Sequence, residues 1–447
     1  MAHAITLTDG TTTVNLITTH KTRDYEQNTI DTSKGDQDGE PEITETLNVT
    51  LFAATGPLLQ TAVNSVELLL VAGKRRNDPK SVLYKTGPRV YLTLQVDGEA
   101  SAWRAEIIDG HFQPDKDMLK IGWPNLQADG ALMVTHRAWE GPEKELQLST
   151  SNASAATGGQ TIYNHDDSGT GHDNWVQIAA AQVGGVLPTP VKLTLTNNTG
   201  SGIGTRNFYL ACNAFSDPAN FIHIIEGEAR QTSYGTIVVD SGDSGGNYNN
   251  YTFTTTGEMK WDLSAAQMQR TQGRMFRLLM RMHGWSGTNL YVKPQLRDST
   301  GNTILYEGEE VLIGSSTSAL LDLGALPLPN GGYQIAWSDM VLVLVVRCTG
   351  AGIFNLDFIQ LTPLDAYQRV IQRGYTIANG DVITFDNIEG IIHQAGKPIY
   401  SPQDGVLKVF PGVTQRLIIL QDEGGSGSNI ARTFSVRAYI RERRLTV

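Results

Sequence analysis

A short glycine-rich segment, residues 241–250 with the sequence SGDSGGNYNN, comes nearest to a catalytic motif in this chain. Ser244 follows an aspartate and precedes two glycines, a pattern in which a serine hydroxyl can act as a nucleophile. That chemistry needs a histidine to accept the hydroxyl proton and a buried carboxylate to orient the histidine. The motif therefore indicates a hydrolase only if the rest of the chain supplies both partners.

The surroundings of this motif differ from those in chymotrypsin-like serine proteases, where Gly-Asp-Ser-Gly-Gly contains the nucleophile. Those enzymes have a cysteine two residues before the first glycine and a proline after the last, where this chain has Asp240 and Asn247. None of the upstream histidines lies in an Ala-Ala-His-Cys setting; they are His3, His20, His111, His136, His165, His172 and His223. Because glycine and asparagine supply the positive φ angles of tight loops, we interpret the segment as a polar loop between two strands. Ser244 is predicted not to be a nucleophile.

Other groups of polar residues suggest metal or acid chemistry, but none has the spacing of a known motif. Asp240 and Asp243 are possible Ca²⁺ ligands without a full ligand set. The segment 149–174 contains metal-ligand residue types in a glycine-rich stretch, namely His165, Asp166, Asp167, His172 and Asp173. Two carboxylate pairs occur, Glu226 with Glu228 and Glu309 with Glu310, and surface charge is the simpler interpretation of both. Walker, GxGxxG, HExxH and GxSxG patterns are absent, so we predict no enzyme activity, cofactor or metal site.

Composition and charge favour a β-rich protein. Glycine accounts for 46 of 447 residues and only 18% of the residues are charged. The net charge of −11 argues against direct recognition of nucleic acid, and we interpret the basic run 74–76 as surface charge at a helix end. The N-terminal sequence lacks a secretory-signal pattern and no apolar run is long enough to span a membrane. The two cysteines, Cys212 and Cys348, form no metal motif, and the sequence leaves open whether they pair.

Hydrophobic patterning divides the chain into four segments. Residues 1–150 are predicted to form an antiparallel β domain with one packed helix, which Thr55 caps and Gly73 ends. The apolar face of that helix comprises Leu58, Leu59, Ala62, Val63, Val66, Leu69 and Leu70. Residues 151–174 are interpreted as a linker, and 175–365 as a second all-β domain in which 340–347 is a central strand. Residues 366–447 are short strands expected to extend the N-terminal domain.

Two parts of the sequence resemble a known protein family. The stretches ITETLNVTLFA (43–53) and LLQTAVNSVELLLVA (58–72) are similar to the N-terminal domain of distal tail or baseplate-type proteins of long-tailed bacteriophages. The end of the chain, VFPGVTQRLIIL (409–420) with TFSVRAYIRERRL (433–445), resembles the end of phage tail proteins. The stretch FNLDFIQLTPLD (354–365) is similar to the final strand of jelly-roll, carbohydrate-binding-module-like domains. Together these resemblances imply a mainly β protein with a tail-ring domain and a jelly-roll β-sandwich.

The resemblance implies a structural virion protein of a phage tail, assembled in the host cytoplasm. Its expected partners are copies of itself in a ring of six, or three nearer the tip, and other tail proteins. The acidic segment 31–45 and the basic end 432–444 are expected to meet between subunits, where Arg441, Arg443 and Arg444 would contact carboxylates. The alternatives are a glycan-binding spike, decoration or lectin-like protein, and, third, a hydrolase. The candidate residues for stacking on a host surface glycan are Trp261, Trp285, Trp337, Tyr248 and Tyr251.

Overall fold

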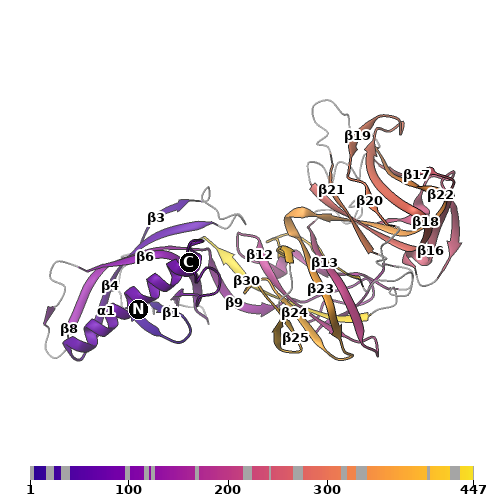
Figure 1. The fold of residues 1–447 in the computed structure, drawn as a ribbon. Helices are drawn as coiled ribbons and strands as arrows, with labels where there is room; N and C mark the ends of the chain where they lie inside the picture. Colours follow the sequence, from indigo (N-terminus) through magenta and orange to yellow (C-terminus); the bar gives the residue numbers. More distant parts are fainter. Residues whose placement is uncertain are drawn as a thin grey trace. The chain divides into compact units, whose positions relative to one another are not determined.

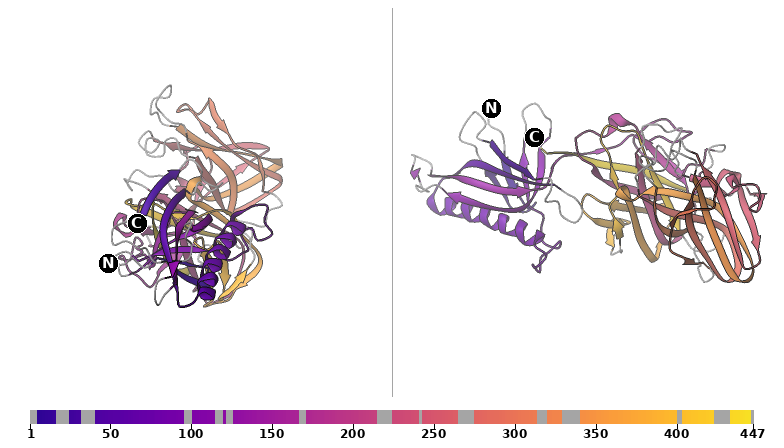
Figure 2. Two further views of the ribbon diagram at one scale, coloured as in Figure 1. Left: turned by 90° about the vertical axis from the view of Figure 1, so that its left-hand side faces the viewer. Right: turned by 90° about the horizontal axis from the view of Figure 1, so that it is seen from above.

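The computed structural model shows a mainly β protein with antiparallel sheets and, among the residues it describes, one α-helix, as the sequence predicts (Figures 1 and 2). It describes residues 5–16, 25–31, 41–95, 101–114, 120–121, 126–166, 171–214, 224–240, 243–264, 275–313, 320–328, 340–399, 403–422 and 433–445. Unit 1 comprises residues 1–143, 184–187 and 441–447, and unit 2 comprises residues 144–183 and 188–440. Among the described residues, no helix has both the length and the apolar character needed to cross a membrane.

Unit 1 is an antiparallel sheet with a helix packed on it. The sheet runs in the order β2-β1-β5-β6-β8-β4-β3, because β6 pairs with β5 near its start and with β8 near its end. Its strands are β1 (Ile5–Thr8), β2 (Thr13–Leu16), β3 (Tyr25–Asp31), β4 (Glu42–Ala53), β5 (Tyr91–Leu94), β6 (Trp103–Pro114), β7 (Lys120–Ile121) and β8 (Leu126–His136). The strand β9 (Trp139–Glu145) follows β8 in the chain. Along β4 buried and exposed side chains alternate, as expected for a sheet with one covered face.

The helix α1 (Gly56–Asn77) confirms much of the predicted local structure. The Thr55 hydroxyl accepts a hydrogen bond from the Leu58 backbone N–H, which is the predicted N-cap. The face packed on β4, β6 and β8 buries Leu59, Val63, Val66, Leu69 and Leu70. Two predictions were wrong: Leu58 is 56% exposed, and Gly73 does not end the helix. Gly73 lies inside α1, at a point where a Cβ would stand only 3.0 Å from the Ile107 carbonyl oxygen. The absence of a side chain therefore permits close packing of the helix on the sheet.

The first part of unit 2 is a β-sandwich. One sheet has the order β11-β29-β13-β23-β27, with β11 (Trp175–Ile178), β13 (Ile203–Ala214), β23 (Tyr367–Ile377), β27 (Gln403–Gly405) and β29 (Gln415–Asp422). The other contains β10 (Gln160–Tyr163), β12 (Thr189–Asn197), β24 (Val382–Asp386), β25 (Ile391–Gln394), β26 (Lys397–Ile399), β28 (Lys408–Val409) and β30 (Thr433–Arg444). Phe208 from the first sheet makes edge-to-face contacts with Phe385 and Phe434 from the second. Apolar side chains from both sheets therefore share one core.

The second part of unit 2 is a nine-stranded sheet that surrounds its own apolar core. Its strands are β14 (Ile224–Glu226), β15 (Thr236–Val239), β16 (Asn247–Phe253), β17 (Thr256–Leu263), β18 (Met275–Arg297), β19 (Ile304–Glu307), β20 (Val311–Leu312), β21 (Leu320–Pro327) and β22 (Met340–Pro363). The strands β18 and β22 pair along most of their length, with register shifts near Gly287, whose φ is 139°. The apolar run 340–347 pairs on both sides, with β17 and β18, which confirms the predicted central strand.

The predicted domain boundaries need correction in four places. The segment 151–174 is not a linker, because it contributes β10 and buries His165 and Asn174 in unit 2. The predicted domain 175–365 is divided between the sandwich and the nine-stranded sheet, and only the β-sandwich-like character of a jelly roll is evident. Of residues 366–447, only 441–447 join unit 1, because strands β23, β24 and β29 pair with partners inside unit 2. The N-terminal segment of unit 1 ends at 143 rather than 150.

Candidate functional site

The motif around Ser244 lies in the connection between β15 and β16, which pair as a hairpin. Gly245 and Gly246 have φ angles of 63° and 73°, a conformation that favours glycine. The Gly246 N–H donates to the Asp243 carbonyl at 3.0 Å, and the Asp240 N–H donates to the Gly246 carbonyl at 3.1 Å. The prediction of a glycine-rich loop between two strands is therefore confirmed, and the two glycines have a conformational reason to be there.

Ser244 is fully buried and its polar groups are bound to other elements of unit 2. Its hydroxyl donates to the Asp166 carbonyl oxygen at 2.5 Å and lies 3.0 Å from Glu226 Oε1. Its backbone N–H donates to Asp357 Oδ1 at 2.8 Å. The nearby imidazole of His283 bonds to Asp243 instead of to this hydroxyl. Through these contacts Ser244 connects its loop to β14, to β22 and to the segment that contains Asp166.

A fluorophosphonate probe is expected not to label Ser244, because the buried hydroxyl donates to the Asp166 carbonyl, lies beside the Glu226 carboxyl group and has no hydrogen bond to a histidine among the described residues. The measurement is mass spectrometry of the treated full chain, with Ser244→Ala as the matched control. Labelling that is specific to Ser244 and disappears in the alanine variant would contradict this prediction.

Three carboxyl groups from other parts of unit 2 lie around the Ser244 loop, those of Glu226, Glu228 and Asp357. The side chains of Glu226 and Glu228 both approach Gly245, so the pair does converge and the interpretation as surface charge was wrong. Burial raises the pKa of Glu226 to about 9, with smaller contributions from the charges of Asp357 and Glu228. Burial also raises the pKa of Glu228. At neutral pH the Glu226 side chain therefore holds a proton.

Asp357 and Arg281 form a buried ion pair beside this group. Their side chains are 0% and 2% exposed, and Arg281 Nε lies 3.6 Å from Asp357 Oδ2. The Arg281 guanidinium also donates to the Asn164 carbonyl oxygen at 2.5 Å. Burial, followed by the charge of Asp243, raises the pKa of Asp357, and Arg281 opposes that shift. The sequence does not indicate this pair, because only the pairing of β18 with β22 brings the two residues together.

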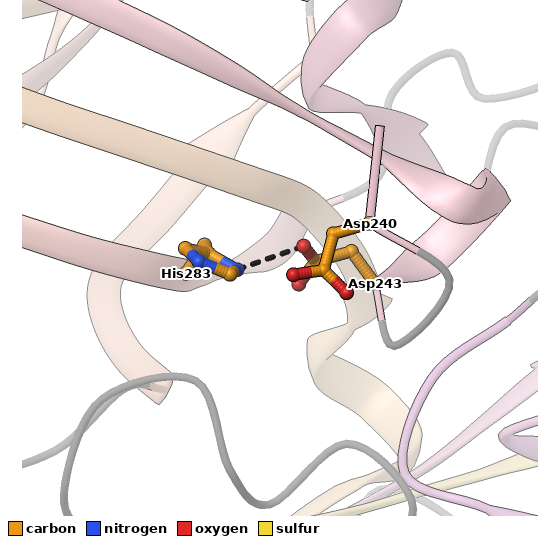
Figure 3. A group of neighbouring side chains, drawn as sticks. All are labelled: Asp240, Asp243 and His283. Carbon is orange, nitrogen blue, oxygen red and sulfur yellow. Dashed lines mark hydrogen bonds and ion pairs between the residues drawn. The ribbon is translucent and has the colours of Figure 1, made fainter. Parts of the chain in front are cut away.

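His283 lies where the pairing of β18 with β22 shifts register, between Met282 and Gly284. Such a bulge redirects a side chain out of the regular alternation, and here the imidazole points to Asp243 (Figure 3). His283 Nδ1 lies 2.8 Å from Asp243 Oδ2, and the Tyr248 ring stacks on the imidazole at 4.0 Å between centroids. Burial raises the pKa of Asp243 to about 6, against the opposing effect of His283. Asp240 and Asp243 thus lie beside a histidine that the sequence did not connect to them.

The metal-ligand residue types in 149–174 do not gather at one point. His165 Nε2 lies 3.0 Å from His172 Nδ1, while the Asp173 carboxylate accepts hydrogen bonds from the Ser151 N–H and hydroxyl. The Asp166 carboxylate accepts from the Trp175 indole N–H at 3.2 Å. Asp167 lies outside the described residues. Asp166 and Asp173 therefore accept hydrogen bonds from other residues of unit 2.

The candidate glycan-binding aromatics have different environments. Trp261 is 1% exposed and its indole N–H donates to the Glu226 carbonyl, so it belongs to the core and cannot stack on a sugar. Tyr248 is occupied by its stacking on His283, and the Tyr251 hydroxyl accepts a hydrogen bond from the Glu258 N–H. Trp285 is partly buried against the core of the nine-stranded sheet. Trp337 lies outside the described residues.

The three C-terminal arginines have partners inside unit 1. Arg441 donates to the Gly141 carbonyl oxygen at 3.0 Å, and the Arg444 guanidinium lies 4.3 Å from the centroid of the Trp103 ring. Arg443 is 5% exposed. Burial raises the pKa of Glu140, and the charges of Arg104, Arg443 and Arg441 oppose that shift. Arg443 thus lies near a carboxyl group of its own chain, and contact of the three arginines with a neighbouring subunit stays a prediction.

Both cysteines are buried in unit 2 and their thiols donate hydrogen bonds. Cys212 Sγ lies 3.2 Å from Gln415 Oε1, and Cys348 Sγ lies 3.1 Å from the Gly350 carbonyl oxygen.

Comparison of the chain with protein-family models and with curated proteins found no match. The function must therefore be argued from the fold and from the site itself.

Proposed function

We propose that this protein is a structural component of a bacteriophage tail, a distal tail or baseplate ring protein that carries a β-sandwich unit. The observation that supports this most is the path of the chain. Residues 144–440, apart from 184–187, form unit 2, and residues 441–447 return to unit 1. Unit 2 is thus inserted into unit 1, and distal tail proteins, which parts of this sequence resemble, can carry inserted domains of this kind.

The surface of unit 1 supports a role in assembly. The outer side of α1 carries Leu68 and Val71, which are 69% and 42% exposed, although the opposite side of the helix already packs on the sheet. Val82, in the turn after the helix, is 95% exposed. Apolar side chains that gather on one element mark an interaction surface more often than scattered ones do. In a ring, each subunit would cover this surface with its neighbour, a heterologous contact that closes when the rotation permits.

Imaging of the purified full chain by negative-stain electron microscopy, together with light scattering, tests the proposal. Rings of six subunits, or of three, are the expected result. Dispersed monomers at micromolar concentration would contradict the ring, and binding of those monomers to a bacterial surface glycan would favour a free adhesin instead.

Replacing Leu68 and Val71 with glutamate is expected to shift the protein from rings to monomers while leaving the chain folded. Both residues are exposed in the single chain, so the charges affect only a surface that a neighbour covers. Gln60→Glu with Lys74→Gln is the matched control, because it also changes the charge by two units at exposed positions of α1. Light scattering measures the assembly state and circular dichroism the fold. Rings of unchanged size in the Leu68/Val71 variant would place the interface elsewhere.

A further inference from the structure

Three side chains that could bind a metal ion meet beside the Ser244 loop. Asp240 and Asp243 come from the connection between β15 and β16, and His283 comes from β18 (Figure 3). One ligand atom from each lies within 4.8 Å of the other two. We infer that Asp240, Asp243 and His283 form a binding site for a divalent transition-metal ion of the Zn²⁺ type. This inference does not depend on the proposed function of the whole chain.

The spacing of the ligand atoms suits a shared ion. Oxygen and nitrogen ligands bind Zn²⁺ at about 2.0–2.2 Å, so two ligands of one ion lie roughly 3 Å apart. His283 Nδ1 and Asp243 Oδ2 are separated by 2.8 Å, and a carboxylate oxygen of Asp240 lies within 4.8 Å of a ligand atom of each. Asp240 is partly exposed, so water can reach the remaining coordination positions.

An unsatisfied buried oxygen gives independent support. Asp243 is 0% exposed, and its Oδ1 has no hydrogen-bond partner among the described residues. A buried carboxylate oxygen without a partner costs free energy, and a cation is one of the few partners that would satisfy it. His283 Nδ1 contacts the other oxygen of the same carboxylate, and an ion bound between these two residues would take the place of that hydrogen bond.

The local charge also favours a cation. Glu228 and Asp357 lie around the loop in addition to the two proposed carboxylate ligands, and Arg281 is the arginine that lies beside Asp357 among the described residues. Acidic groups therefore outnumber basic ones in an interior where each unbalanced charge is costly. A bound divalent ion would reduce that imbalance without any change in the protein.

The ligand types and their rigidity indicate which ion would bind. An imidazole nitrogen with carboxylate oxygens suits Zn²⁺, Mn²⁺ or Co²⁺ better than Ca²⁺, which prefers oxygen ligands alone. The stacked Tyr248 ring, parallel to the imidazole within 9°, fixes the orientation of His283. Backbone hydrogen bonds in the loop position Asp243, whose N–H donates to the Asp240 carbonyl at 3.0 Å. The site is therefore largely formed before the ion arrives.

Isothermal titration of the full chain with ZnCl₂, after treatment with EDTA, tests the inference. We expect one ion per chain, and a rise of the melting temperature by about 4 °C at a hundredfold excess over Kd. The isosteric variants Asp243→Asn and His283→Gln should weaken binding by about 100-fold or more, since even residues behind the ligands change affinity 10–100-fold. Circular dichroism without metal checks that both variants fold.

Two control variants test whether Zn²⁺ binds at the proposed site and not at another histidine. His111→Gln replaces an exposed histidine of unit 1 and should leave binding unchanged. His172→Gln disrupts the neighbouring His165–His172 pair, and it too should leave binding unchanged. The inference is overturned if the chain binds no Zn²⁺, if the His172 variant alone loses binding, or if Ca²⁺ binds more tightly than Zn²⁺.

Discussion

Replacement of Arg281 with methionine is expected to lower the free energy of unfolding by about 3–5 kcal/mol, the usual cost of removing one partner from a buried ion pair. Asp357 is fully buried, and Arg281 is the cation that opposes the increase of its pKa. Methionine retains much of the volume of the arginine stem but leaves Asp357 without that charge and Asn164 without its hydrogen bond. Chemical denaturation of the full chain measures the loss.

A second substitution separates the effect of charge from that of packing. In the double variant Arg281→Met with Asp357→Asn, the uncompensated charge is gone and the asparagine oxygen can still accept the Ser244 N–H. We therefore expect the double variant to be more stable than the single one. Arg347→Met removes an exposed pair with Glu310 on the same sheet and should change stability much less. Equal losses in the single and double variants would show that packing, and not the charge of Asp357, explains the effect.

The variant Glu226→Gln is expected to be more stable than the natural chain at pH 8, by about 2–4 kcal/mol, and equally stable near pH 4. The folded chain holds the Glu226 proton up to a pKa of about 9, whereas the unfolded chain releases it near the ordinary value of 4.5. As the pH rises between these two values, the free energy of unfolding falls by up to about 1.4 kcal/mol per pH unit. Glutamine has no proton to release, so the variant lacks this loss of stability.

The control for the pH series is a carboxyl group whose pKa is lowered by the fold, so that its effect on stability has the opposite dependence on pH. The Arg437 guanidinium lowers the pKa of Glu145, so ionisation of that carboxyl group stabilises the fold above its unfolded pKa. Glu145→Gln should therefore reduce stability at pH 8 and have little effect at low pH. Denaturation midpoints for both variants between pH 4 and pH 9 check the two trends. A Glu226→Gln variant that follows the natural chain across this range would mean that Glu226 is ionised in the fold.

Local features of this protein were predictable because they depend on neighbours in the sequence. The Thr55 cap and the apolar spacing of α1 follow from helix geometry within one or two turns. The glycines at 245 and 246 indicated a tight loop, since few other residues adopt positive φ at low cost. The run 340–346 is apolar at every position, which is typical of a strand covered on both sides.

The tertiary structure decided what lies around that loop, because the contacts there join residues far apart in the chain. The Ser244 N–H binds a carboxylate 113 residues away, and its hydroxyl binds a carbonyl 78 residues away. The alternation of a strand specifies which side chains share a face, but not which strand lies beside it or where a bulge shifts the register. Burial of Glu226 and the approach of His283 to Asp243 depend on such pairings. The sequence by itself thus determined the loop, and only the fold determined that it carries a buried acidic cluster with a histidine.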